Sequence, residues 1–339
     1  MTEVREGRLD RMAPALLLAF LAPMFAEVLP GATRFSSIFV LPIEIAVWGG
    51  GAVLARALAR TRGLGWWSLL LLGMALSVAE EFLIQQTSVA PMVIRLKGET
   101  WGRAFGLNYI YFLWALAYES IWVVLLPTLT TELIFAKRRT EPWLSKAGAI
   151  VTGALFAIAC FLAWFTWTQI ARTKVFHQPP YTPPLAWSAA AATAIALLFV
   201  AALRFPPKVR RGLVPPPRWI VGLLGAVWAV LWFGLVVLAF GVDPQFPEIG
   251  AGSGGLIVIA FLLYFVPRWA AHPRWSRGHA FALIAGSLTG SMAVSFVGFI
   301  GSASNDLWFK VIVDVAAVTG LLWLGRRVSR SFERQGTAS

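Results

Sequence analysis

Residues 69–86 read LLLLGMALSVAEEFLIQQ, and this stretch decides the fold class. It is apolar over a length that matches a membrane-spanning helix, which needs about 20 residues. Two adjacent carboxyl groups, Glu80 and Glu81, interrupt it. Ionisable groups at such depth are costly and rare, and they usually pair or mark a functional site. The stretch therefore predicts a transmembrane helix that carries an acidic site.

Apolar blocks of this length recur along the whole chain, which is 58% hydrophobic and only 13% charged. Such a composition excludes an ordinary soluble domain. We predict an all-α fold, a polytopic transmembrane helical bundle of about ten spans. The predicted spans are 12–30, 36–59, 65–86, 106–135, 146–170, 185–203, 218–241, 252–270, 279–301 and 306–325.

The basic residues indicate how these spans are oriented. The net charge of +13 comes from Arg and Lys in the short segments between apolar blocks, which favours a topology signal over a nucleic-acid partner. When the spans alternate across the membrane, most of the 29 basic residues fall on the side that holds both termini. That side is cytoplasmic by the positive-inside rule. We therefore predict a bacterial inner-membrane protein with the lipid bilayer as its partner and both termini inside.

The chain is predicted to form one transmembrane domain, 1–339, in two parts. Residues 1–203 hold the first six spans, and residues 219–339 hold the last four. Between them, 204–218 reads RFPPKVRRGLVPPPR, a basic, Pro-rich cytoplasmic loop. Two small-residue stretches, Gly49–Gly51 and Gly286 with Gly290, predict close helix packing, since glycine lets helix backbones approach one another in lipid.

Acidic side chains from the first four spans are predicted to converge in one layer. The alternation places Glu27, Glu44 and the Glu80–Glu81 pair toward the outer ends of the first three spans. Side chains four residues apart share a helix face, so Gln85 follows Glu81, and Tyr111 and Glu119 form a stripe on the next span. The candidate ligand- or ion-binding residues are Glu27, Glu44, Glu80, Glu81, Gln85, Tyr111 and Glu119.

Adjacent carboxyl groups in a low dielectric do not both ionise unless a cation joins them. Glu80 and Glu81 therefore predict a site for a proton, a cation or a cationic small molecule. The alternative is a structural, hydrogen-bonded pair. For Glu27 and Glu44, the alternative is a position near the interface where the carboxylate reaches water, and Glu132 is expected at the cytoplasmic interface.

Asp306, Lys310 and Asp314 follow one another at four-residue spacing in the last span, and we expect an intramembrane charge triad whose members satisfy each other. The three histidines are His177, His272 and His279. They lie in loops or at a span end, and none has metal-ligand spacing with another histidine or a carboxylate on one helix. We expect no metal and no cofactor, and the sequence assigns no catalytic residue.

The segments 22–27 (APMFAE), 49–66 (GGGAVLARALARTRGLGW), 80–81 and 138–144 (RRTEPWL) resemble the front half of a family of bacterial multi-pass membrane proteins of unknown activity. This resemblance implies architecture alone. Glu80-Glu81 is also distantly similar to the Glu-Glu-x-x-x-Arg motif of CAAX-protease-like intramembrane metalloproteases. That resemblance implies a zinc peptidase, but Gln85 stands where the motif has Arg, and 111–119 offers no histidine.

Three functions remain open from the sequence. The first is a proton- or cation-linked small-molecule transporter or binding protein, centred on Glu80 and Glu81. The second is a diverged CAAX-protease-like peptidase or a non-catalytic relative of one. The third is a membrane scaffold in which the acids are structural. Only the second is an enzyme.

Overall fold

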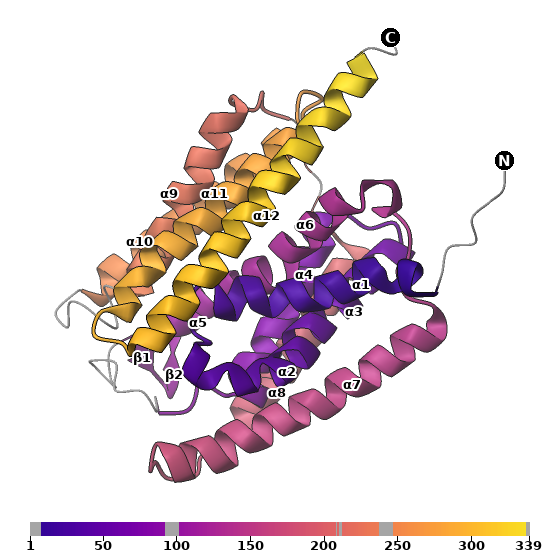
Figure 1. The fold of residues 1–339 in the computed structure, drawn as a ribbon. Coiled ribbons are helices and arrows are strands. Elements are labelled where there is room, and N and C mark those ends of the chain that lie inside the picture. The colour runs from indigo at the N-terminus through magenta and orange to yellow at the C-terminus, as the bar shows by residue number, and fades with distance from the viewer. Residues whose placement is uncertain (1–7, 92–101, 208, 210–211, 237–246, 337–339) are drawn as a thin grey trace.

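The structure is a computed structural model that describes residues 8–91, 102–207, 209, 212–236 and 247–336. It is an all-α bundle with one short hairpin, β1 (Arg103–Ala104) antiparallel to β2 (Leu107–Asn108) (Figure 1). The α-helices are α1 (Arg8–Pro23), α2 (Leu41–Glu44), α3 (Gly50–Thr61), α4 (Trp66–Ala79), α5 (Tyr109–Tyr118), α6 (Leu126–Ile134), α7 (Lys146–Trp164), α8 (Leu185–Arg204), α9 (Arg218–Val236), α10 (Glu248–Ala270), α11 (Arg277–Ser295) and α12 (Ser304–Gly336).

Ten helical segments within the described residues are long and apolar enough to cross a membrane, which confirms the predicted fold class. Most of their ends lie within a few residues of the predicted bounds. The fifth continues to Val175 instead of 170, and α12 continues to Gly336 instead of 325. Hydropathy marks only the part of a helix that lies in lipid, so helix beyond the bilayer escapes it. Residues 237–241, the predicted end of the seventh span, lie outside the described residues.

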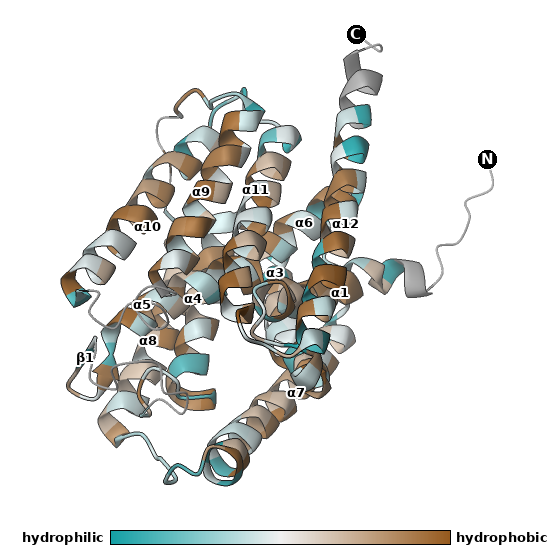
Figure 2. Ribbon diagram, turned by 60° about the vertical axis from the view of Figure 1, so that its left-hand side comes forward, coloured by the Kyte–Doolittle hydropathy of each residue, from teal (hydrophilic) through white to brown (hydrophobic). Residues whose placement is uncertain are grey.

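The outer faces of the bundle carry large apolar side chains that a soluble protein would bury. On α7, Ile150, Leu155, Ile158 and Phe161 are all exposed. Figure 2 shows apolar residues along the middle of the helices and hydrophilic ones at helix ends, as at the end of α12. Exposed faces of this kind are stable in hydrocarbon, where each helix satisfies its own backbone hydrogen bonds. The chain is therefore an integral multi-pass membrane protein.

The predicted glycine contacts are confirmed. An added Cβ at Gly49 would lie 2.1 Å from the Ala19 carbonyl oxygen of α1, and Gly51 packs on Leu76 of α4. An added Cβ at Gly290 would lie 2.4 Å from the Ala226 carbonyl oxygen of α9. Helices α9 and α11 run side by side over most of their length (Figures 1 and 2). Backbones this close leave no room for side chains, which is how small residues join helices in lipid.

A buried arginine ties the basic end of α3 to the segment after α6. Arg56 is 1% exposed, and it donates from Nε to Glu132 (3.2 Å) and from its terminal nitrogens to the carbonyls of Arg139 and Glu141. Its guanidinium also stacks on Trp143, 3.2 Å from the ring centre. Glu132 therefore takes part in a structural ion pair. Segments 49–66 and 138–144, which the sequence analysis noted separately, meet here.

Residues 204–218 connect α8 to α9, and 208, 210 and 211 lie outside the described residues. The Leu213 amide donates to the Arg268 carbonyl (3.0 Å), so this connector packs against the end of α10. The division of the chain into 1–203 and 219–339 remains a prediction.

Candidate functional site

The first four spans each leave α-helical geometry next to a carboxyl group. Their π-helical segments are Met24–Val28, Ile45–Gly49, Glu80–Ile84 and Glu119–Leu125. Glu27, Glu80, Glu81 and Glu119 lie inside such segments, and Glu44 immediately precedes one. A π-helical turn adds a residue to the helix, re-aims its side chains and is frequent at functional sites. The last of these segments ends just before Pro127, where the missing N–H already interrupts the helix.

Among the described hydrogen bonds, Glu81 accepts more from protein groups than the other acids of this group do. It is 2% exposed and accepts hydrogen bonds from Thr87 Oγ1 (3.0 Å) and Ser88 Oγ (2.5 Å) in the turn that follows its helix. Its carboxyl group also interacts electrostatically with Glu119. Two neighbouring carboxyl groups do not both ionise in a low dielectric unless a cation joins them.

Glu80 has no such support. It is 1% exposed, and among the described residues neither carboxyl oxygen has a hydrogen-bond partner. Its electrostatic neighbours are two further acids, Glu81 and Glu27. Buried polar atoms without a partner are rare in folded proteins, and each indicates strain, function or a missing ligand or water. Glu80 is the clearest such position in this chain.

Glu27 and Glu44 form the more accessible part of the group. Both are half-buried, they interact electrostatically, and Glu44 accepts a hydrogen bond from Thr33 Oγ1. The buried Trp48 indole lies within hydrogen-bonding reach of Glu27. These contacts hold Glu27 and Glu44 beside each other, and their position near the interface stays a prediction.

Two tyrosines of α5 complete the group. Asn108 caps this helix by accepting from the Tyr111 amide (2.9 Å). Tyr111 interacts electrostatically with Glu27, Glu80, Glu81 and Glu119, and Tyr118 does so with Glu27, Glu44 and Glu119. We call the set Glu27, Glu44, Glu80, Glu81, Glu119, Tyr111 and Tyr118 the carboxyl cluster.

The carboxyl cluster has no positive counter-charge. Within the described part of the chain, none of its five carboxylates forms an ion pair with Arg or Lys. Arg56 and Arg60 pair with Glu132, and Lys310, which bonds the Leu29 carbonyl near Glu27, pairs with Asp314. Ionising several unpaired carboxylates in a low dielectric is strongly unfavourable. The cluster is therefore a candidate site for a proton or a cation.

Gln85 is not among the described hydrogen-bond partners of Glu81, and its place in the site stays a prediction. The helix has π geometry at Glu80, so the Gln85 amide bonds to the Glu80 carbonyl (3.0 Å), five residues back. Thr87 and Ser88 donate to Glu81. The sequence analysis missed Thr87, Ser88, Thr33, Trp48 and Tyr118. Tyr118 alone carried a signal, because it lies seven residues after Tyr111 on one face.

Of the three residues of the expected triad in the last span, Lys310 and Asp314 form an ion pair, and Asp306 bonds Ser36 of another span. Lys310 Nζ donates to both carboxyl oxygens of Asp314 (2.8 and 2.6 Å) and to the Leu29 carbonyl (2.7 Å). Asp306 instead accepts from the Ser36 amide (2.9 Å) and hydroxyl (3.1 Å). The expected triad is therefore divided, because Ser36 of another span competes for Asp306. Its structural purpose is to fix the ends of the first two spans to α12.

The histidines lie apart from the carboxyl cluster. His279, at the start of α11, stacks on Trp275 and contacts the Ser276 hydroxyl through Nδ1 (2.8 Å). The Arg274 amide bonds to His272 Nδ1. Among the described residues no group of three or more His, Cys, Asp or Glu side chains has the arrangement of a metal site. The oxygen donors of the carboxyl cluster are carboxyl, hydroxyl and phenol groups, which suit a proton or a hard cation better than zinc.

The fold and this cluster define the chain as a polytopic helical membrane protein with buried carboxyl groups. No family model, no curated protein and no solved structure matches the chain. The two family resemblances noted in the sequence, including that to CAAX-protease-like proteins, therefore gain no support from these comparisons.

Proposed function

We propose that this protein binds a proton or a small cation at the carboxyl cluster and uses it to drive binding or transport of a small molecule. The observation that carries the proposal is Glu80, which is fully buried with both oxygens unpartnered and with acids as its neighbours. Such a group is stable when a proton or cation neutralises it. A site that must exchange its charge is what coupled transport requires.

The π-helical segments give this proposal independent support. Four of them occur beside the acids in four successive spans. A fifth, Phe165–Val175 in the fifth span, carries no acid, so the support comes from the position of the four beside the acids and not from π geometry alone. Non-ideal helix turns at membrane depth are tolerated where they line a site. In many transporters, interrupted helices near the membrane midplane supply the ion ligands.

The experiment is a thermal-unfolding series on the full chain in neutral detergent, from pH 5 to pH 9, with sodium, potassium or choline added. We expect the wild-type melting temperature to fall as the pH rises, because deprotonation leaves like charges together, and we expect one cation to restore it. Glu80→Gln/Glu81→Gln keeps the side-chain volume and should abolish both responses. Glu141→Gln, on the exposed surface, is the matched control and should retain them.

If the double variant does not fold, Glu81→Gln alone takes its place, because Thr87 and Ser88 also donate to a neutral amide oxygen. An unchanged pH and cation response in either variant would contradict the proposal and leave the scaffold function. Zinc bound to purified protein and lost in Glu81→Ala would instead favour the peptidase.

A further inference from the structure

A second site lies at the basic end of the bundle, away from the carboxyl cluster. The end of α6 with the 3₁₀ turn Ala136–Arg138, the start of α11 and the last described turns of α12 enclose a cavity of about 790 Å³. Half of the residues that line it are basic, and none of these described residues is acidic. The basic residues are Lys137, Arg138, Arg277, Arg326, Arg327 and Arg330. We call this the basic pocket.

The positive-inside distribution of basic residues does not require that they gather around one cavity. Lys137 and Arg138 are far from the α12 arginines in the sequence, and only the fold brings them together. Arg138 pairs with Glu141 at the surface. The other basic residues have no acidic partner among the side chains that the structure describes, and Arg327 instead stacks on Trp323, 5.4 Å from the ring centre. Like charges gathered around one cavity are stabilised by an anion that enters it.

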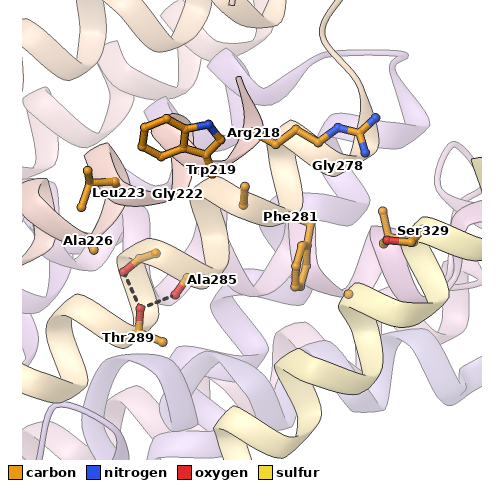
Figure 3. A pocket seen from close by; sticks show the side chains of 14 residues that line it. Arg218, Trp219, Gly222, Leu223, Ala226, Gly278, Phe281, Ala285, Thr289 and Ser329 are labelled. Atoms are coloured by element: carbon orange, nitrogen blue, oxygen red, sulfur yellow. Dashed lines mark hydrogen bonds between the residues drawn. The ribbon is translucent and has the colours of Figure 1, made fainter. Parts of the chain in front are cut away.

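An apolar groove adjoins the basic pocket. It has a volume of about 570 Å³ and lies between α9, α11 and α12 (Figure 3). Val328 lines both cavities. Of the sequence neighbours Arg277 and Gly278, Arg277 lines the basic pocket and Gly278 lines the groove. Small residues form the floor of the groove and leave space above it, namely Gly222, Ala226, Ala282, Ala285 and Gly286. In Figure 3, Phe281 forms one wall, and Arg218 extends over Gly278 at one end.

We propose that the two cavities together bind one anionic phospholipid, with its phosphate in the basic pocket and an acyl chain in the groove. The charge of the pocket selects a negative headgroup. The groove runs along membrane-spanning helices and presents mainly apolar atoms, which a soluble anion does not need. Basic pockets between transmembrane helices at the cytoplasmic side bind phosphate-bearing lipid headgroups in this way.

The experiment titrates the full chain in neutral detergent with dioleoyl phosphatidylglycerol or phosphatidylcholine and counts bound lipid by native mass spectrometry. We expect preferential binding of one phosphatidylglycerol. Arg326→Gln/Arg327→Gln/Arg330→Gln should weaken it by roughly tenfold or more, since each basic residue near an anionic lipid contributes substantially. Arg62→Gln/Arg204→Gln/Arg274→Gln removes the same charge from exposed positions outside both cavities and should bind as wild type does.

A second variant tests the groove. Thr289 lines it but is exposed, so Thr289→Trp should fill it without disturbing the core, and it should remove the preference for a long-chain over a short-chain phosphatidylglycerol. Soluble glycerol phosphate and inorganic phosphate serve as competitors. Full displacement of the lipid by either, equal binding of the two lipids, or equal losses in the two triple variants would overturn the proposal.

Discussion

At the scale of single residues, the protein treats its buried charges in two ways. Lys310 is 1% exposed, but Asp314 and the Leu29 carbonyl satisfy all three of its donors. Glu80 is equally buried, but its oxygens have no donor among the described residues. Burial of a charge is tolerated when hydrogen bonds and a counter-charge replace water. The contrast separates a structural charge from the carboxylate on which the proposed proton or cation site is centred.

We expect Lys310→Met to lower the free energy of unfolding by about 3–5 kcal/mol, because it leaves Asp314 as an uncompensated buried charge. Lys310→Met/Asp314→Leu should regain most of that loss, since Ser295 Oγ still reaches the Leu29 carbonyl. Glu141→Gln, which removes an exposed pair, should cost less than about 1 kcal/mol. Unfolding in detergent measures all three, and a double variant as unstable as the single one would contradict the pairing.

At the scale of elements, three arginines on the less basic side bond to backbone carbonyls within the protein. Arg34, Arg103 and Arg172 each donate to backbone carbonyls: Arg34 to Gly298, Arg103 to Val89 and Ala90, and Arg172 to Pro91 and Pro179. Burial of the Arg103 guanidinium lowers its pKa, and nearby Tyr181 opposes that shift. A guanidinium group that donates to backbone carbonyls in this way is not a free surface charge. Around the basic pocket, by contrast, several arginines have no acidic partner among the side chains that the structure describes.

Helix packing gives a prediction at this scale. Gly290→Ala should lower the free energy of unfolding by at least 1–3 kcal/mol, because the new Cβ would meet the Ala226 carbonyl oxygen and force α9 and α11 apart. Gly234→Ala, in α9, has no atom within 4 Å of its added Cβ. It should leave stability unchanged or raise it by up to about 1 kcal/mol through better helix propensity. Equal effects of the two substitutions in a detergent unfolding assay would contradict this packing.

At the scale of the whole molecule, the basic pocket and the carboxyl cluster are built by largely different helices of one bundle. The alternation of ten spans predicts that both termini and most basic residues lie on one side. The acid-bearing π-helical segments lie in the first four spans, and the lipid cavities involve α6, α9, α11 and α12. Because α11 and α12 both contact α6, an occupant of the basic pocket touches the same span that carries Glu119.

The predicted orientation is tested with single thiols in a Cys160→Ala background. Phe105→Cys, at a position that is 97% exposed, should react with a membrane-impermeant reagent added to intact cells. Arg62→Cys and Arg274→Cys should react only after the cells are opened, because their loops lie on the basic side. The reverse pattern would invert the topology, and labelling of all three in intact cells would contradict the ten-span alternation.

The sequence by itself determined the fold class, the span number and the concentration of acids in the first four spans. Hydropathy, length and charge are local properties that any segment carries with it, so these features could be read before folding. The Gly49–Gly51 and Gly286/Gly290 contacts were also readable, because close approach in lipid requires small residues.

The partners of the charged groups follow from the packing of the spans. Asp306 bonds Ser36, Lys310 pairs with Asp314, Glu132 pairs with two arginines, and Thr87 and Ser88 donate to Glu81. Spacing along one helix does not show which residues of other spans and turns reach these groups. Partners from distant spans compete for the same charged atoms, and the outcome depends on how the spans pack.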